Sequence, residues 1–187
     1  MKQLKILCYA ILLITIATFL PEISSAQSTK KDSIWQPLKV FVGEWKGKGG
    51  GEPGEGNYER TYKFIFNKQY IEVKNKSVYP PTDKKPQGEV HEDIGYISFD
   101  KSRHTFVLRQ FHLEGFVNQY QLDSISADGK MIVFISESIE NIPAGWRAKE
   151  TYRILDDNQI QETFELAEPN KEFEVYSKVT LKRMIGQ

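Results

Sequence analysis

The chain has 187 residues, a length that favours one domain. Its 25 basic and 25 acidic residues give no net charge. A nucleic-acid partner or an anionic membrane surface calls for a basic excess, so the composition supports neither. The one cysteine, Cys8, lies in an apolar run near the N-terminus. We therefore expect neither a disulfide nor a thiolate metal site in the mature protein.

The first 26 residues have the three parts of a secretory signal peptide. Two lysines lie among the first five residues, residues 6–20 are almost wholly apolar, and a small-residue cleavage site ends at Ala26. The apolar run has about 15 residues, whereas a membrane-spanning helix needs roughly 20. We predict a signal peptide over 1–26 and a secreted or periplasmic protein; an uncleaved N-terminal anchor is the alternative.

Cleavage after Ala26 leaves 161 residues with 23 basic and 24 acidic side chains, enough chain for one sizeable core. The polar segment 27–33 is expected to be a disordered linker, and 34–187 to form the folded domain. Residues 34–38, Ile-Trp-Gln-Pro-Leu, predict a short helical turn before the first strand.

Beyond this turn, apolar and polar residues alternate with a period of two, which is typical of half-buried antiparallel strands. In 146–155, one face is apolar except for a carboxylate: Trp146, Ala148, Glu150, Tyr152 and Ile154. In 58–66, one face collects aromatic rings around an arginine: Tyr58, Arg60, Tyr62, Phe64 and Phe66. The predicted strands are 40–48, 58–66, 69–79, 90–99, 103–112, 116–125, 130–138, 146–155, 159–166 and 173–182.

Turn-forming residues separate these strands, beginning with Gly49-Gly50-Gly51 after the first. A meander of about ten long strands must protect its edges, and closure into a barrel removes them. We therefore predict an all-β fold: one antiparallel up-and-down β-barrel of about ten strands after a short N-terminal helical turn. Ten strands leave an interior wide enough for a ligand.

Gly43 and Trp45 near the chain start and Arg183 near its end form the first candidate group. In a closed barrel the first and last strands pair, so Trp45 would close one end and Arg183 could lie over its indole face. Gly43 leaves space for that stacking. We interpret these three residues as structural.

A helical turn, Gly-x-Trp on the first strand, short-linked strands and a terminal arginine resemble the calycin superfamily, which includes lipocalins and fatty-acid-binding proteins. Residues 41–49, Phe-Val-Gly-Glu-Trp-Lys-Gly-Lys-Gly, resemble the Gly-x-Trp-x-Gly-x-Gly opening of nitrobindin-type haem-binding barrels. Residues 91–96, His-Glu-Asp-Ile-Gly-Tyr, resemble that family's His-x-acid-x-Gly-Tyr motif. A set of uncharacterised bacterial secreted barrels is similar to about the same degree.

The resemblance implies haem held through a histidine near the C-terminus, on the last strand. No histidine follows His112 in this chain, and alignment of 179–183 puts Tyr176 at about that position. Tyrosine can ligate ferric haem, so Tyr176 is the candidate haem ligand. Strand alternation points Tyr176 outward unless a bulge turns it inward.

Arg60, Asn118, Glu150 and Glu162 fall on faces predicted to point inward. A buried charge is costly unless it is paired, so Arg60 is expected to face Glu150 or Glu162. Arg60 would either bind a ligand carboxylate or form a structural ion pair. The candidate ligand-binding residues add three inward tyrosines to these four: Arg60, Tyr62, Asn118, Tyr120, Glu150, Tyr152 and Glu162.

The histidines give no metal site. His104 and His112 share a face but lie about 27 Å apart along a strand, and His91 with Asp93 offers two ligands without a third. Glu150 and Glu162, on neighbouring strands, could act as acid and base and leave an enzyme as an alternative.

The function predicted from these features is non-catalytic binding of a small hydrophobic or amphipathic ligand inside a barrel. The alternatives are haem or tetrapyrrole binding, the carboxylate-based enzyme, and a packed barrel that contacts other proteins. No cofactor other than haem is suggested. The expected partner is a small molecule, without nucleic acid and without a membrane span after signal cleavage.

Overall fold

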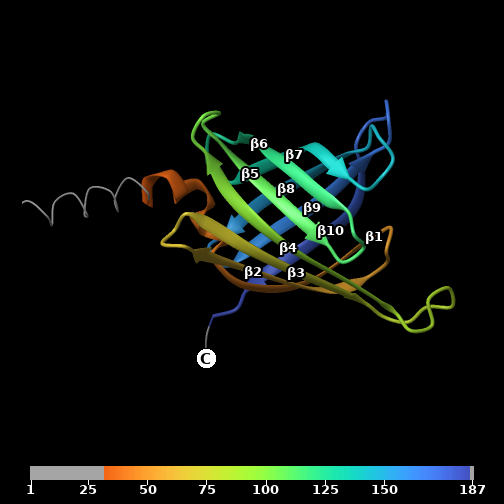
Figure 1. Cartoon of the computed structure of the whole chain (residues 1–187). Helices are drawn as coiled ribbons and strands as arrows, with labels where there is room; N and C mark the ends of the chain where they lie inside the picture. Colours follow the sequence, from red (N-terminus) through yellow and green to blue (C-terminus); the bar gives the residue numbers. More distant parts are fainter. Residues whose placement is uncertain (1–31, 186–187) are drawn as a thin grey trace, which may run out of the picture. The chain divides into compact units, whose positions relative to one another are not determined.

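A computed structural model describes residues 32–185 (Figure 1). The predicted signal peptide and nearly all of the predicted linker lie outside the described residues. The chain divides into two compact units, 1–39 and 40–187. Residues 32–35 form a turn of α-helix and η1 (Gln36–Phe41) is a 3-10 helix, so the predicted helical turn is present and slightly longer. None of the helices among the described residues has the length and hydropathy needed to cross a membrane.

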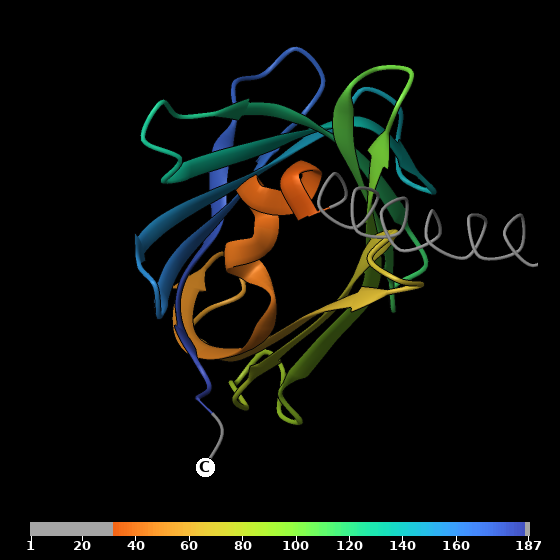
Figure 2. The ribbon, with the colours of Figure 1, turned by 90° about the vertical axis from the view of Figure 1, so that its left-hand side faces the viewer.

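The second unit is a closed antiparallel barrel of ten strands in which β10 pairs with β1 (Figures 1 and 2). The strands are β1 (Gly43–Gly51), β2 (Gly56–Ile65), β3 (Tyr70–Tyr79), β4 (Glu89–Asp100), β5 (Thr105–His112), β6 (Val117–Ile125), β7 (Met131–Glu140), β8 (Arg147–Asp156), β9 (Gln159–Ala167) and β10 (Glu174–Arg183). Every strand pairs with its neighbours in the chain, so successive turns alternate between the two ends. The predicted fold class is confirmed.

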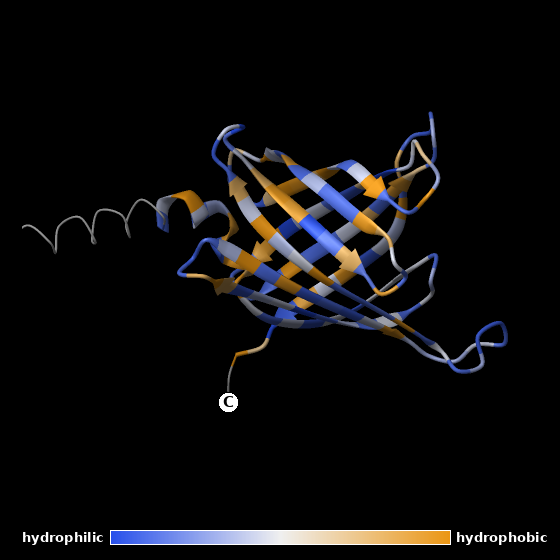
Figure 3. Ribbon diagram, viewed as in Figure 1, coloured by the Kyte–Doolittle hydropathy of each residue, from blue (hydrophilic) through white to orange (hydrophobic). Residues whose placement is uncertain are grey.

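Burial along the strands follows the alternation in the sequence, and Figure 3 shows it as alternating orange and blue along the ribbon. On β2, Tyr58, Arg60 and Tyr62 are buried, whereas Glu59 and Lys63 are exposed. A side chain that points into the barrel loses contact with water while its neighbour keeps it, and this difference fixes the register of each strand.

One end of the barrel is closed by Trp45, which pairs in register with Arg183 of β10. The guanidinium carbon of Arg183 lies 4.1 Å from the indole centroid. Arg183 donates hydrogen bonds to the carbonyl oxygens of Val40 and Val42 at 2.6 and 2.7 Å. A Cβ atom on Gly43 would lie 2.8 Å from the Arg183 guanidinium, so only glycine leaves that space free.

The first strand begins and ends later in the structure than the sequence predicted. Residues 40–41 belong to η1 rather than to the first strand, and the predicted turn at Gly49–Gly51 is the end of β1. Cβ atoms on Gly47, Gly49 and Gly51 would lie 2.0–2.2 Å from carbonyl oxygens of β10. The glycines therefore let the two backbones approach where the barrel wall bends, and this long-range contact is absent from the local sequence pattern.

A strict period of two would also point three aromatic or apolar residues inward, in the predicted strands 58–66 and 173–182, but the structure places them elsewhere. Phe66 is 75% exposed, because the turn after β2 takes a left-handed conformation that begins at this residue. A β-bulge between Val175 and Ser177 reverses the alternation, so Val175 is exposed. Phe173 lies beneath the cations of two β8 residues, Arg147 and Lys149, whose side chains belong to the polar face.

The glycine contacts predict the cost of a methyl group on β1. In Gly49→Ala, the added Cβ would lie 2.2 Å from the Lys178 carbonyl oxygen and 2.7 Å from the Val179 Cα, which are backbone atoms that cannot move away cheaply. We expect a loss of about 1–3 kcal/mol in the free energy of unfolding, measured by urea denaturation. Gly50→Ala is the control, since its Cβ meets only the flexible Glu55 side chain; an equal loss in both variants would contradict the explanation.

Candidate ligand-binding site

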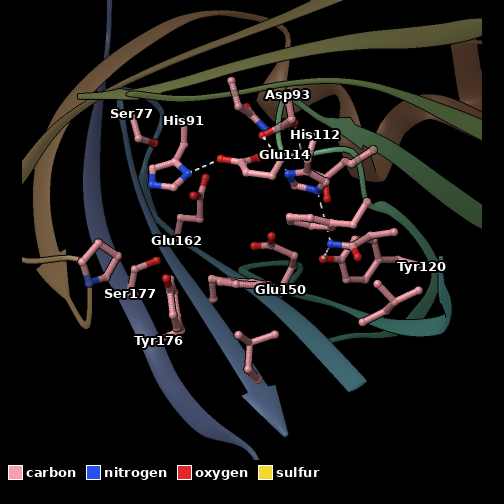
Figure 4. A pocket seen from close by; sticks show the side chains of 18 of the residues that line it. Ser77, His91, Asp93, His112, Glu114, Tyr120, Glu150, Glu162, Tyr176 and Ser177 are labelled. Atoms are coloured by element: carbon pink, nitrogen blue, oxygen red, sulfur yellow. Dashed lines mark hydrogen bonds and ion pairs between the residues drawn. The ribbon is translucent and has the colours of Figure 1, made fainter. Parts of the chain in front are cut away.

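The barrel contains a cavity of about 520 Å³, within the range of small-molecule sites. The floor of the cavity is at Arg60, a lining residue that pairs in register with Trp45 at the closed end. From there the cavity extends to the opposite end of the barrel. At that end it is lined by residues of three connecting turns: Pro53, Glu114, Phe116, Ile142 and Pro143. One end of the barrel is therefore filled by Trp45, and the other holds the cavity, which Figure 4 shows from close by.

The floor of the cavity holds a buried ion pair between Arg60 of β2 and Glu162 of β9. Arg60 donates to both carboxylate oxygens, from Nε at 3.2 Å and from NH2 at 2.8 Å. Its NH1 group contacts the carbonyl oxygens of Glu59 and Lys76 and the Ser77 hydroxyl. Burial alone would lower the pKa of Arg60, but the Glu162 carboxylate outweighs it and raises the pKa.

These contacts bear on the two roles considered for Arg60. Every nitrogen of its guanidinium has a protein acceptor, and both Glu162 oxygens are engaged by it. The geometry is that of a structural ion pair, with little donor capacity left for a ligand carboxylate. The sequence left Glu150 and Glu162 as equal candidates for the partner, and the structure selects Glu162.

Glu150 lies on β8 next to this ion pair but has no cation of its own. Its side chain is 7% exposed, and its Oε2 atom is buried without a hydrogen-bond partner. Burial, and then repulsion from the Glu162 carboxylate, raises the pKa of Glu150 well above its usual range. Figure 4 shows the Glu150 carboxyl pointing into the cavity. This carboxyl is the polar group that the protein leaves unsatisfied at the cavity floor.

A second carboxyl, Asp93 of β4, lies higher on the wall. It accepts hydrogen bonds from the amides of Asn75 at 2.8 Å and Gln110 at 3.4 Å. Burial raises the pKa of Asp93 to about 6, even though Arg60 opposes the shift. Gln110 is 3% exposed, and its Oε1 atom has no partner, so a buried amide oxygen also lies on this wall.

His112 of β5 faces Asp93 with its Nδ1 atom, 4.0 Å from the carboxylate. Its ring stacks on Phe116, with centroids 4.0 Å apart, and its Nε2 lies 3.3 Å from the Asn118 amide nitrogen. Burial lowers the pKa of His112 to about 4, so the imidazole is neutral at neutral pH. The Asn118 amide also donates to the Tyr120 hydroxyl at 2.8 Å, and its Oδ1 is left without a partner.

The mouth of the cavity is polar and solvated. His91 contacts Glu114 through Nδ1 and Glu89 through Nε2, and these three side chains are 27–37% exposed. The His91 ring also packs edge-on against Tyr79, whose hydroxyl lies 2.9 Å from that of Tyr58. Among the described residues, no group of three or more histidine, cysteine, aspartate or glutamate side chains could hold a metal ion.

Aromatic and aliphatic side chains form the rest of the cavity wall. Those that line it are Tyr58, Tyr79, Phe116, Tyr120, Ile139, Ile142, Trp146, Tyr152, Phe164, Leu166 and Tyr176. Tyr176 reaches this wall because the bulge between Val175 and Ser177 interrupts the alternation of β10. A bulge was the one condition under which the sequence allowed Tyr176 to point inward.

The structure brings six of the seven proposed ligand-binding residues to this cavity: Arg60, Asn118, Tyr120, Glu150, Tyr152 and Glu162. The seventh, Tyr62, is buried and stacks on Phe41, with ring centroids 5.4 Å apart. Gly43, Trp45 and Arg183 lie at the closed end.

Eight polar residues of the cavity wall were not among the residues predicted from the sequence: Asn75, Ser77, His91, Asp93, Gln110, His112, Glu114 and Ser177. Gln110 and His112 have the same alternation as the buried Phe106 and Leu108, a signal that could have revealed them. The sequence placed His112 on the same strand face as His104, but His104 lies in the turn before β5, with a φ of 53°.

The ion pair at the floor predicts an asymmetric double-mutant cycle. Arg60→Met leaves the Glu162 carboxylate buried without a cation, and should cost about 3–5 kcal/mol of unfolding free energy. Arg60→Met with Glu162→Leu removes both charges and should recover most of that loss. Chemical denaturation of the wild-type protein, Arg60→Met, Glu162→Leu and the double variant measures the cycle; a double variant no more stable than Arg60→Met would contradict the assignment.

Comparison with known proteins supports the architecture. The solved structure of Rv2717c from M. tuberculosis is similar with a TM-score of 0.60 at 17% sequence identity, covering 81% of this chain and 98% of that one, a likeness of fold alone. A de novo designed fluorescence-activating β-barrel has a TM-score of 0.40 at 12% identity, covering 78% and 95%. No curated protein sequence gives a significant match.

A family model described as the THAP4-like, heme-binding beta-barrel domain matches residues 35–183. The match spans the whole barrel from η1 to the end of β10, including the Gly-x-Trp opening and the terminal Arg183. The protein therefore belongs to the family of THAP4-like haem-binding β-barrel domains.

Proposed function

We propose that the protein binds a small amphipathic molecule inside its barrel without catalysing a reaction on it. The observation that carries this proposal is a cavity of about 520 Å³ whose wall is mostly aromatic and aliphatic, with a few buried polar groups at fixed positions. This combination of an apolar container and sparse, oriented polar groups is how small-molecule sites are usually built.

An enzyme that uses Glu150 and Glu162 as acid and base fits the geometry less well. Both carboxyls line one cavity, but both oxygens of Glu162 accept hydrogen bonds from Arg60. A general base needs a free lone pair within reach of the substrate proton, and this carboxylate is committed to its ion pair. Binding is therefore the function that the floor of the cavity supports.

The family description names haem, and the residues of this cavity do not fit that group. Haem iron needs an axial ligand with a free donor atom. A tyrosine must lose its phenol proton to ligate iron, and burial, which raises the pKa of Tyr176, opposes that loss. The Nε2 of His112 faces the Asn118 amide, and both nitrogens of His91 contact carboxylates.

The charges of the cavity also oppose haem, which carries two propionates. Four carboxyl groups line the cavity, on Asp93, Glu114, Glu150 and Glu162. The one lining arginine is already paired with a carboxylate. A second anionic pair inside this wall would meet repulsion without a free cation to offset it.

The proposed binding takes place outside the cytoplasm. Support comes from the sequence of residues 1–26, with its basic start, its short apolar run and its small-residue end at Ala26. An extracytoplasmic location also suits a mature chain without cysteine, because its stability needs no particular redox conditions.

Native mass spectrometry of the protein, purified gently from its own host, tests both statements. We expect a chain that begins at Gln27, recovered outside the cytoplasm, with one small organic molecule bound per barrel. Leu166→Trp, which fills the cavity from its wall, should lower affinity for the neutral probe N-phenyl-1-naphthylamine by about tenfold or more. Thr163→Trp on the opposite face of β9 is the control, and equal binding by both variants would contradict the site.

Titration of the protein with haem tests the statement that this cavity does not bind haem. With the mature protein we expect no stoichiometric shift of the Soret band, because no free axial donor and no free cation line the cavity. A shift that saturates at one equivalent and disappears in Tyr176→Phe or His112→Gln would show that haem does bind through that residue.

A further inference from the structure

Four buried side-chain oxygens of cavity-lining residues have no hydrogen-bond partner: Glu150 Oε2, Asn118 Oδ1, Gln110 Oε1 and Asn75 Oδ1. Glu150, Asn118 and Gln110 are 7%, 2% and 3% exposed and come from three strands, β8, β6 and β5. A buried acceptor without a donor costs about 1–3 kcal/mol, so a matching occupant must supply donors.

The orientation of the Asn118 amide follows from its neighbours. His112 is neutral, and a proton on its Nδ1, which faces Asp93, leaves Nε2 as an acceptor. The Asn118 nitrogen then donates to His112 Nε2 and to the Tyr120 hydroxyl. The Asn118 Oδ1 atom is therefore the part of the amide that has no hydrogen-bond partner.

Most of the charged groups that act on Glu150 are carboxyl groups, as Glu150 itself is. The titratable groups whose charges act on it are Arg60, Asp93, Glu162 and Glu165, and it in turn acts on Tyr62, Tyr120 and Tyr152. Arg60 is the one cation in this set, and it forms a bidentate pair with Glu162. Glu150 is therefore a buried carboxyl whose positive partner the protein does not provide.

The wall above this floor suits an apolar body attached to a cation. Tyr120, Tyr152 and Trp146 line the cavity together with Glu150. Aromatic faces attract organic cations as well as apolar groups, and a desolvated cation near such a ring gains about 2 kcal/mol or more. An inorganic ion would leave this apolar surface without an occupant.

We propose that the cavity selects an organic cation: an apolar molecule with a protonated amine that donates to the Glu150 carboxylate. This inference rests on the proposed function and deepens it by naming the ligand class. On binding, the ammonium becomes the counter-ion of the Glu150 carboxylate, and any proton held by that carboxyl in the free protein passes to solvent. Haem, an anion, is selected against by the same charges.

Three ligands of equal chain length test the proposal on the mature protein: decylammonium, decan-1-ol and decanoate. Their dissociation constants are measured by displacement of N-phenyl-1-naphthylamine. Decylammonium should bind at least about tenfold more tightly than the alcohol, because charge-assisted hydrogen bonds to a buried carboxylate are strong. Decanoate should bind more weakly than the alcohol, since its negative charge meets the carboxyl groups of the wall, and the lining arginine is already paired with Glu162.

Glu150→Gln removes the charge while keeping the shape, and should bring decylammonium to within about twofold of the alcohol. Glu165→Gln is the matched control: Glu165 lies on the outer face of the same strand pair, where it pairs with Lys149 at 2.8 Å. This variant should keep the full preference for the ammonium.

Circular dichroism and thermal unfolding of each variant show that it is folded, and a hydrophobic residue offers a second test if Glu150→Gln is unstable. Glu150→Leu removes the acceptor altogether and should likewise abolish the preference for the ammonium. Equal affinities of wild-type protein for ammonium and alcohol, or a preference that survives both substitutions, would overturn the proposal while leaving binding in the barrel intact. Displacement of the probe by none of the three ligands would overturn the proposed function as well.

Discussion

The buried ion pair between Arg60 and Glu162 is the interaction on which the functional half of the barrel depends. Its partners come from β2 and β9, which are separated in the wall by β1 and β10, so the pair crosses the interior. A lone charge at this depth would be too costly to keep. By satisfying each other, the two groups form a polar floor beside Trp45, and they leave Glu150 as the carboxyl that a ligand must satisfy.

The two ends of the barrel divide stability from binding. At the closed end, Trp45, Arg183 and the glycines of β1 join the first strand to the last through stacking, carbonyl hydrogen bonds and close backbone contact. Close packing at this end contributes folding free energy, which offsets the packing contacts that are missing around the cavity at the other end. The hollow end can then hold unsatisfied acceptors at Asn118 and Glu150, because the fold does not depend on their being paired.

Alternation in the sequence was sufficient to predict the strands and the inward direction of Arg60 and Glu150, because each depends on a local period of two. The closed barrel followed from the number of strands and from the need to protect the edges of the sheet. Alternation could not predict the bulge that turns Tyr176 to the cavity, the backbone contact that keeps Gly49 in a strand, or the choice of Glu162 over Glu150 as the ion partner. These features are set by contacts between strands distant in sequence. The volume of the cavity belongs to the same class, since it depends on how all inward side chains pack together.

The residues that carry the family resemblance overlap only in part with those that would select a ligand. The Gly-x-Trp opening and Arg183 lie where the barrel closes, whereas the motif at 91–96 contributes His91 and Asp93 to the cavity wall. The proposed ligand would meet Glu150, Asn118 and Gln110, where the cavity offers unpaired acceptors and carboxyls rather than a free axial donor. Because closure does not constrain these three residues, the same barrel can keep its fold while the polar groups of its interior, and with them the preferred ligand, differ.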